Sequence, residues 1–125
     1  MAPDLSDDEV KDISHVLRKN NIDGLIATNT TLARDKVSDL KHGSEQGGLS
    51  GDPVKELSTA VIAGFNQHLN GEIPIIGVGG ISNAADAVDK IKAGADLVQI
   101  YTGLIYQGMS LISQSKKAIA QERES

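Results

Sequence analysis

The sequence contains no cysteine and no tryptophan, and only one phenylalanine and two tyrosines occur among its 125 residues. The absence of cysteine excludes disulfide bonds, thiolate nucleophiles and zinc-thiolate centres. The scarcity of aromatic side chains means that the core must be built mainly from Ile, Leu, Val and Ala. At 39% hydrophobic and 23% charged residues, the composition is otherwise that of a globular protein.

Basic clusters and long apolar runs are also missing. The 12 basic residues are outnumbered by 17 acidic ones, which gives a net charge of −5, whereas nucleic-acid-binding proteins present a basic surface. We therefore expect no nucleic-acid partner. No apolar run reaches the ~18 residues of a membrane-spanning helix, and the polar N-terminus does not resemble a signal peptide. We expect a soluble chain that forms one domain over residues 1–125.

Helical and strand patterns alternate along the chain. Ser6 followed by Glu9 is a capping box, which predicts a helix over residues 7–19. Short apolar runs predict strands at residues 24–28, 73–78 and 97–101. Helical spacing predicts helices over 52–69 and from Ser82 or Asn83 to 93, a short helical turn after Thr102-Gly103 to about residue 107, and a last helix from about 110. The expected inner-face residues are Val54, Leu57, Val61, Phe65 and Leu69 in one helix and Ala84, Val88 and Ile91 in the next.

One helix followed by three strand-helix pairs predicts a parallel sheet with helices packed on its outside. Two architectures fit this order, a doubly wound sheet and a part of a (βα)8 barrel. A complete barrel needs about 250 residues, and this chain is half that length.

Polar residues and glycines follow the predicted strands, at the end where both architectures bind ligands. Gly79-Gly80 follows the second strand, and Gly47–Gly51 precedes a helix at the end of a long loop. Glycines let backbone N–H groups approach an anion, and a helix N-terminus favours negative charge. These segments predict a phosphate site, with a tight turn and a flexible loop as the alternatives. There is neither a G-x-G-x-x-G fingerprint, since position 82 is Ser, nor a P-loop.

Two other sets of polar side chains could bind a ligand or a metal. Asn29 and Thr30 could hydrogen-bond the polar edge of a planar ligand, or could be an ordinary polar strand exit. The three histidines, His15, His42 and His68, lie far apart in the sequence, so we expect no metal site.

Four segments resemble class 2, quinone-dependent dihydroorotate dehydrogenases in order and spacing: residues 26–31, 47–51, 74–81 and 97–103. Residues 2–5 are also similar to the tail of that family's fifth strand. The resemblance implies an α/β fold, namely the C-terminal part of a (βα)8 TIM barrel with three parallel strands and flanking helices. Another FMN-dependent barrel oxidoreductase is the runner-up family.

The resemblance implies an enzyme that oxidises dihydroorotate to orotate with FMN and passes electrons to quinone in pyrimidine biosynthesis. It also implies a membrane-associated parent protein, on the cytoplasmic side of a bacterial inner membrane or on the mitochondrial inner membrane. By position, the cofactor-binding residues would be Thr28, Gly51, Gly79, Gly80, Tyr101 and Thr102. The substrate-binding residues would be Asn29 and Thr30.

Two functional residues of the family have no counterpart here. Its catalytic serine base lies in the N-terminal half, and its flavin-contacting lysine would immediately precede Met1. We therefore expect no catalytic residue in this chain and no turnover by the chain alone. Two alternatives stay open, an FMN- or phosphate-binding module and a half-barrel that self-associates through open strand edges. The residues expected on its uncovered inner face are Ile26, Ile76, Val78, Val98 and Ile100.

Overall fold

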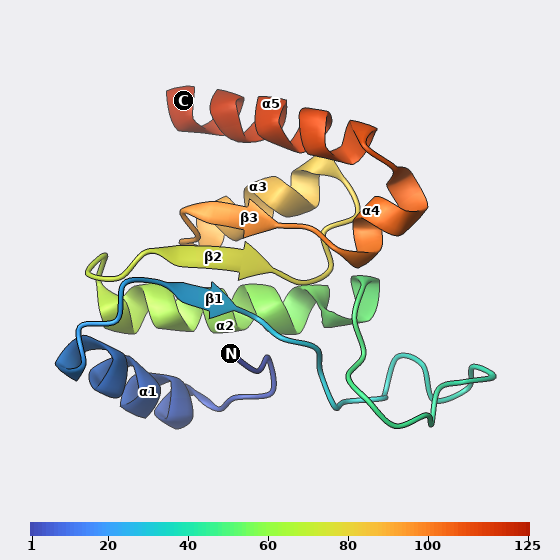
Figure 1. Cartoon of the computed structure of the whole chain (residues 1–125), viewed down its shortest axis with the longest axis horizontal. Coiled ribbons are helices and arrows are strands. Elements are labelled where there is room, and N and C mark those ends of the chain that lie inside the picture. The colour runs from blue at the N-terminus through green and yellow to red at the C-terminus, as the bar shows by residue number, and fades with distance from the viewer.

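A computed structural model describes residues 1–125 and contains one parallel sheet of three short strands (Figure 1). The strands are β1 (Leu25–Ala27), β2 (Ile75–Val78) and β3 (Leu97–Gln99), and they lie in the order β1-β2-β3. Both neighbouring pairs are parallel, as the alternation of strands and helices predicts.

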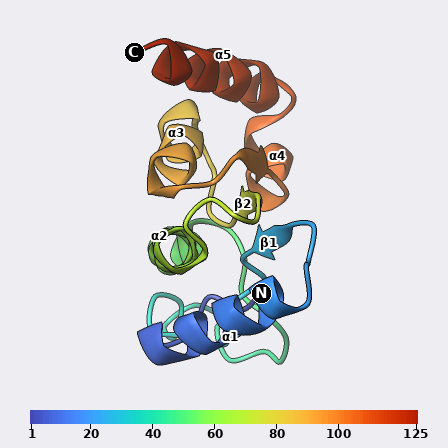
Figure 2. The same ribbon diagram turned by 90° about the vertical axis from the view of Figure 1, so that its left-hand side faces the viewer.

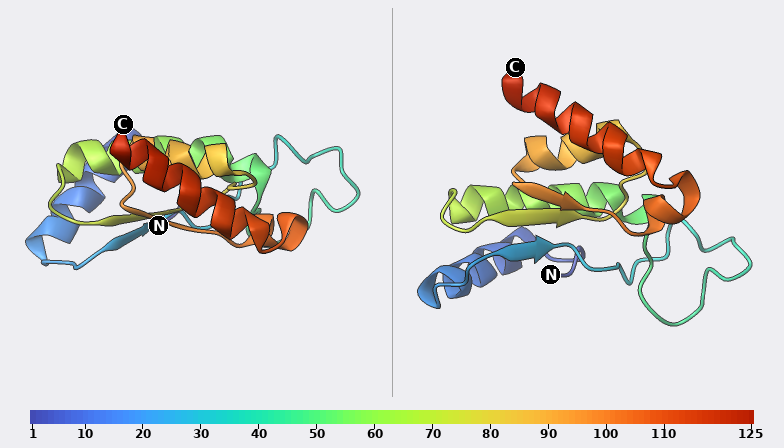
Figure 3. Two further views of the ribbon diagram at one scale, coloured as in Figure 1. Left: turned by 90° about the horizontal axis from the view of Figure 1, so that it is seen from above. Right: turned by 45° about the horizontal axis from the view of Figure 1, so that its top comes forward.

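The helices cover only one face of this sheet. They are α1 (Asp7–Lys19), the 3-10 turn η1 (Asp52–Val54), α2 (Lys55–Leu69), α3 (Ala84–Ala93), α4 (Thr102–Gln107) and α5 (Ser110–Glu124). Figure 2 shows α1, α2, α3 and α5 stacked on one side, where each packs against the next. Figure 3 shows, from above, that no helix covers the opposite face. None of the helices combines the length and the apolar character that crossing a lipid bilayer requires.

At the starts of α1 and α3, residues that the sequence predicts as caps make capping hydrogen bonds. The Ser6 hydroxyl accepts the Glu9 N–H at 3.2 Å, and the Glu9 carboxylate accepts the Ser6 N–H at 2.8 Å, which completes the capping box. Of the two candidate caps of α3, Asn83 takes the role and accepts the Asp86 N–H at 2.9 Å. Each cap satisfies an N–H group that has no partner inside the helix.

The main core lies between the sheet and helices α1 and α2. The register pairs Leu25 with Ile75 and Ala27 with Gly77, so these residues point together towards the helices. They meet Ile62, Phe65 and Leu69 of α2, all fully buried, and Val10 of α1. Phe65 is the only aromatic residue of this core, which is otherwise aliphatic as the composition predicts.

Two helix faces differ from the prediction. Leu57 of α2 is 39% exposed, whereas Ser58 and Ile62 are fully buried. In α3, the expected inner residues Ala84, Val88 and Ile91 are only partly buried. The fully or nearly buried residues of α3 are Asp86, Ala87 and Lys90. α3 packs against both α2 and α5, and its buried Asp86 and Lys90 are both hydrogen-bonded to Lys55 of α2.

The uncovered face of the sheet carries a different set of β3 residues from the one predicted. Ile76 pairs with Leu97 and Val78 with Gln99, so Leu97 and Gln99 share the open face with Ile26. Val98 was expected there, but it pairs with Gly77 and therefore lies on the helix-covered face. The prediction is wrong for Val98 because the register between strands is not encoded locally.

A long loop joins β1 to η1 and extends away from the sheet (Figure 1). An isolated antiparallel bridge between Thr31 and Leu49 closes its base. The Asp4 carboxylate accepts hydrogen bonds from the Thr31 hydroxyl and the Leu32 N–H, and the Arg34 guanidinium donates to the carbonyls of Glu45 and Gly47. These contacts hold the two ends of the loop together beside the sheet.

Candidate functional site

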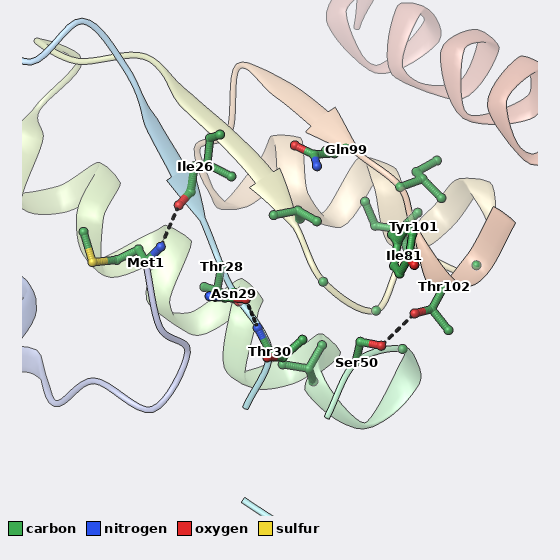
Figure 4. Close-up of a pocket in the computed structure, with 17 residues that line it drawn as sticks. Met1, Ile26, Thr28, Asn29, Thr30, Ser50, Ile81, Gln99, Tyr101 and Thr102 are labelled. Atoms are coloured by element: carbon green, nitrogen blue, oxygen red, sulfur yellow. Dashed lines mark hydrogen bonds between the residues drawn. The ribbon is translucent and has the colours of Figure 1, made fainter. Parts of the chain in front are cut away.

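A pocket of about 360 Å³ opens at the carboxyl ends of the three strands (Figure 4). Its volume is in the range of small-molecule sites. Its lining comes from the exit of each strand and from the end of the long loop. The lining residues are Met1, Ile26, Thr28, Asn29, Thr30, Ser50, Gly51, Val54, Val78, Gly79, Gly80, Ile81, Gln99, Ile100, Tyr101, Thr102 and Gly103.

The pocket brings together all eight residues predicted to bind a cofactor or substrate. The exit of β1 supplies Thr28, Asn29 and Thr30, and the long loop supplies Gly51. The exits of the other strands supply Gly79, Gly80, Tyr101 and Thr102. Parallel strands place their carboxyl ends at one edge of the sheet, so residues up to 74 positions apart line one cavity. Their individual binding roles stay predictions.

One end of the pocket offers free backbone donors. The N–H groups of Gly51 and Gly80 donate to no acceptor in the structure. Gly80 has φ +73°, and a Cβ at this position would lie 2.7 Å from the Lys55 backbone nitrogen. Gly80 therefore lies directly against the first turn of α2, where only a glycine fits. Free N–H groups at the start of a helix are the donors that an anion such as phosphate requires.

The other end of the pocket is formed by the exit of β1. The Thr28 side chain is buried, and its hydroxyl oxygen has no hydrogen-bond partner. The Asn29 amide oxygen accepts the Thr30 N–H at 2.8 Å, which leaves the amide nitrogen free to donate (Figure 4). A polar ligand at this end would meet a hydroxyl and an amide whose hydrogen-bonding capacity is not used within the chain.

Among the lining residues that the sequence did not predict as site residues, Ser50, Gln99 and Met1 bear most directly on the site. The Ser50 hydroxyl shares a hydrogen bond of 2.8 Å with Thr102, which ties the long loop to the exit of β3 (Figure 4). Gln99 lies on the open face, which strand alternation would have shown once the register was known. Met1 donates its ammonium to the Ile26 carbonyl at 3.2 Å and accepts the Asn29 N–H, so it lines the outer edge of β1.

No charged side chain lines the pocket, but a charged cluster lies behind its glycine-rich end. The Lys55 ammonium lies 3.2 Å from the Asp86 carboxylate, and this hydrogen bond and opposite charge raise the pKa of Lys55. Lys90 is fully buried, and the loss of solvation lowers its pKa to about 8. No group of three or more His, Asp or Glu side chains has the geometry of a metal site.

Comparisons with known proteins point to one family. The family model described as dihydroorotate dehydrogenase matches residues 1–122. The quinone-dependent dihydroorotate dehydrogenase of Shewanella woodyi is 62% identical over 112 residues, covering 90% of this chain and 33% of the relative. That of Paracidovorax citrulli is 55% identical over 119 residues, covering 95% of this chain and 33% of the relative.

Solved structures agree with the sequence relatives. The Eimeria tenella dihydroorotate dehydrogenase in complex with ferulenol has a TM-score of 0.89 and 40% identity, covering 97% of this chain and 32% of that one. The ligand-free structure has a TM-score of 0.90 and 38% identity, covering 100% and 34%. The chain thus spans about a third of the length of its relatives, and its sheet is a part of a TIM barrel rather than a doubly wound sheet. On these grounds the chain belongs to the dihydroorotate dehydrogenase family.

Proposed function

We propose that this chain forms the FMN-phosphate and orotate-contacting part of a quinone-dependent dihydroorotate dehydrogenase. The observation that carries the proposal is the single pocket that gathers all eight predicted residues at the carboxyl ends of the strands. The family membership supports it, since relatives 52–62% identical are named as quinone-dependent enzymes.

The residues of the pocket fit FMN. The free N–H groups of Gly51 and Gly80 would hold the phosphate, together with the backbone around Tyr101 and Thr102. Gly79 continues the same turn. The buried Thr28 hydroxyl, which has no partner in the chain, would hydrogen-bond the flavin. An unsatisfied buried polar group costs about 1–3 kcal/mol, so a ligand that satisfies it is favoured.

In the parent enzyme, bound FMN would supply the acceptor for the hydride of dihydroorotate. The residues of this chain bind and orient the reactants. Asn29 and Thr30 would hydrogen-bond the polar edge of dihydroorotate or orotate, and the Ser50–Thr102 hydrogen bond would hold the loop over the phosphate end. No side chain in the pocket is a general base, so the proton would be taken by a residue outside this chain.

The proposal extends to the partners of the parent protein. Quinone would reoxidise the flavin, and this would place the parent at a membrane, the bacterial inner membrane or the mitochondrial inner membrane. The quinone-dependent names of the relatives support this. The pathway would be pyrimidine biosynthesis.

An FMN titration of the purified chain, followed by flavin fluorescence, tests the proposal. We expect saturable binding that excess inorganic phosphate reverses. The affinity should be micromolar or weaker, because losing several hydrogen bonds of ~1 kcal/mol each costs orders of magnitude in affinity. Failure to bind FMN at millimolar concentration would show that these residues do not form an autonomous cofactor site, and nanomolar binding would contradict the expected weakness.

A second candidate role is self-association, favoured by the uncovered sheet. Ile26 and Leu97 on the open face are 51% and 60% exposed, and Tyr101 beside them is 72% exposed. The outer edges of β1 and β3 pair with no further strand, although Met1 covers part of the β1 edge. For the isolated 125-residue chain, a second copy is the occupant that could bury this face.

A further inference from the structure

Lys90 places a buried ammonium group behind the pocket, between α3 and α2. Its side chain is fully buried, and its Nζ donates to the Lys55 carbonyl at 3.0 Å and to the Thr59 hydroxyl at 2.7 Å. Burying an ammonium group is costly unless its hydrogen bonds are satisfied. Lys55 begins α2 and Thr59 lies one turn further on, so the Lys90 ammonium holds the N-terminal end of this helix, including its first turn.

The first turn of α2, to which Lys90 is hydrogen-bonded, also supports Gly80. A Cβ at Gly80 would overlap the backbone of Lys55, so these two residues are in direct contact. The stem of Lys90 lies against β2, since a Cβ at Gly77 would be 3.2 Å from the Lys90 Cβ. Lys90 therefore connects the strand that leads into Gly80 with the helix on which Gly80 rests.

A second contact reinforces this arrangement. The Asp86 carboxylate accepts the Lys55 ammonium at 3.2 Å and the Ser82 N–H at 3.0 Å, which joins α2 to the turn after Gly80. The charged groups that influence this cluster are Lys55, Asp52 and Glu56 from η1 and α2, and Asp86 and Asp89 from α3. Asp52 is itself hydrogen-bonded to the Ser82 hydroxyl.

We propose that Lys90 is a positioning residue for the phosphate-binding turn, because it fixes the first turn of α2 so that the Gly80 N–H faces the pocket. This inference rests on the proposed function. Although Lys90 lies outside the pocket, it should affect binding of the ligand's phosphate group and should not affect binding of the flavin ring.

The test compares FMN with riboflavin, which lacks the phosphate, in the wild-type chain and in Lys90→Met. We expect Lys90→Met to lose roughly tenfold in FMN affinity, the effect of about one charge-assisted hydrogen bond, while riboflavin affinity is unchanged. Lys92→Met is the matched control, since Lys92 is on the same helix but exposed and 3.9 Å from Glu122. An equal loss for both ligands, or no loss, would overturn the inference.

A milder variant covers the case in which Lys90→Met does not fold. Thr59→Val removes one acceptor of Lys90 and should reduce FMN affinity about threefold, with riboflavin again unaffected. A folded Thr59→Val chain with the wild-type ratio of the two affinities would overturn the inference.

Failure of the proposed function gives a different result. If the wild-type chain does not prefer FMN to riboflavin, the phosphate assignment itself is wrong. The positioning of the turn is then tested without ligand, by the amide resonance of Gly80. Lys90→Met should shift this resonance and Lys92→Met should not, whereas equal spectra for the two variants would count against Lys90 as a positioning residue.

Discussion

Gly80 and Gly71 both have left-handed backbones, with φ +73° and +79°, but they differ in their surroundings. A Cβ at Gly71 meets nothing within 4 Å, whereas a Cβ at Gly80 overlaps the backbone of Lys55. We expect Gly71→Ala to cost about 1 kcal/mol of stability through backbone strain alone. Gly80→Ala should cost more and should also abolish FMN binding, because the turn must move away from α2.

Urea unfolding and FMN titration of the two glycine variants check this prediction. Because Gly80 contacts Lys55, a side chain larger than alanine, such as valine, should also disturb the fold. Equal stabilities, or FMN binding that survives in Gly80→Ala, would contradict the contact with α2 as the reason for glycine at this position.

Lys90 also predicts a dependence of stability on pH. Its pKa is lowered to about 8 in the folded chain, from 10.5 when unfolded, chiefly by burial. Between these values the unfolded chain holds a proton that the folded chain has released, so the free energy of unfolding should rise with pH. The slope is at most about 1.4 kcal/mol per pH unit.

Urea unfolding of wild type and Lys90→Met between pH 7 and pH 10 checks this prediction. The contribution of Lys90 is the difference between the free energies of unfolding of the two chains. The difference should be constant below about pH 8 and should increase above it. Staying below pH 10.5 avoids the titration of Lys55, whose pKa is raised and whose contribution would fall at higher pH. A difference that is flat across the range would mean that Lys90 does not titrate there.

At the scale of elements, α1 depends on a local cap that lies outside the pocket. Ser6→Ala removes the hydroxyl that accepts the Glu9 N–H, and should lower the free energy of unfolding by about 1 kcal/mol without changing FMN affinity. Ser44→Ala in the exposed loop serves as the control. A loss of FMN affinity in Ser6→Ala would show that α1 is coupled to the site.

The presence of a helix could be predicted where the signal is local, whereas the side of a helix that is buried was harder to predict. The capping box and the apolar spacing of Val10, Ile13 and Leu17 are contained in one segment, and α1 forms where they predict. The inner face of α3 was predicted from apolar residues, yet Asp86 and Lys90 are buried there instead. Their burial depends on acceptors and donors that α2 supplies, which no pattern within α3 contains.

At the scale of the whole molecule, the open sheet face predicts association of the isolated chain. Leu97→Lys places a charge on this face and should shift the mass measured by light scattering from dimer or larger towards monomer. Leu40→Lys is the control, since Leu40 is 64% exposed but lies on the long loop. A wild-type chain that is monomeric at high concentration would refute association through this face.

The limited extent of the chain also predicts that it has no activity alone. The chain spans about a third of its relatives and has no general base in its pocket, so we expect no oxidation of dihydroorotate by the purified chain with FMN and a quinone. Turnover measured by orotate formation would contradict this and would require a base within these residues.

The order of elements, the parallel barrel segment and the residues gathered at the strand ends could all be predicted from the sequence. These follow from short-range periodicity, caps and glycine positions, and from motifs whose spacing resembles one family. Two features could be seen only in the folded chain: Leu97 rather than Val98 faces the open side, and Lys90 is buried against Lys55. Strand register and the partners of buried charges are set here by contacts between residues 21 and 35 positions apart, and these contacts form only when the chain folds.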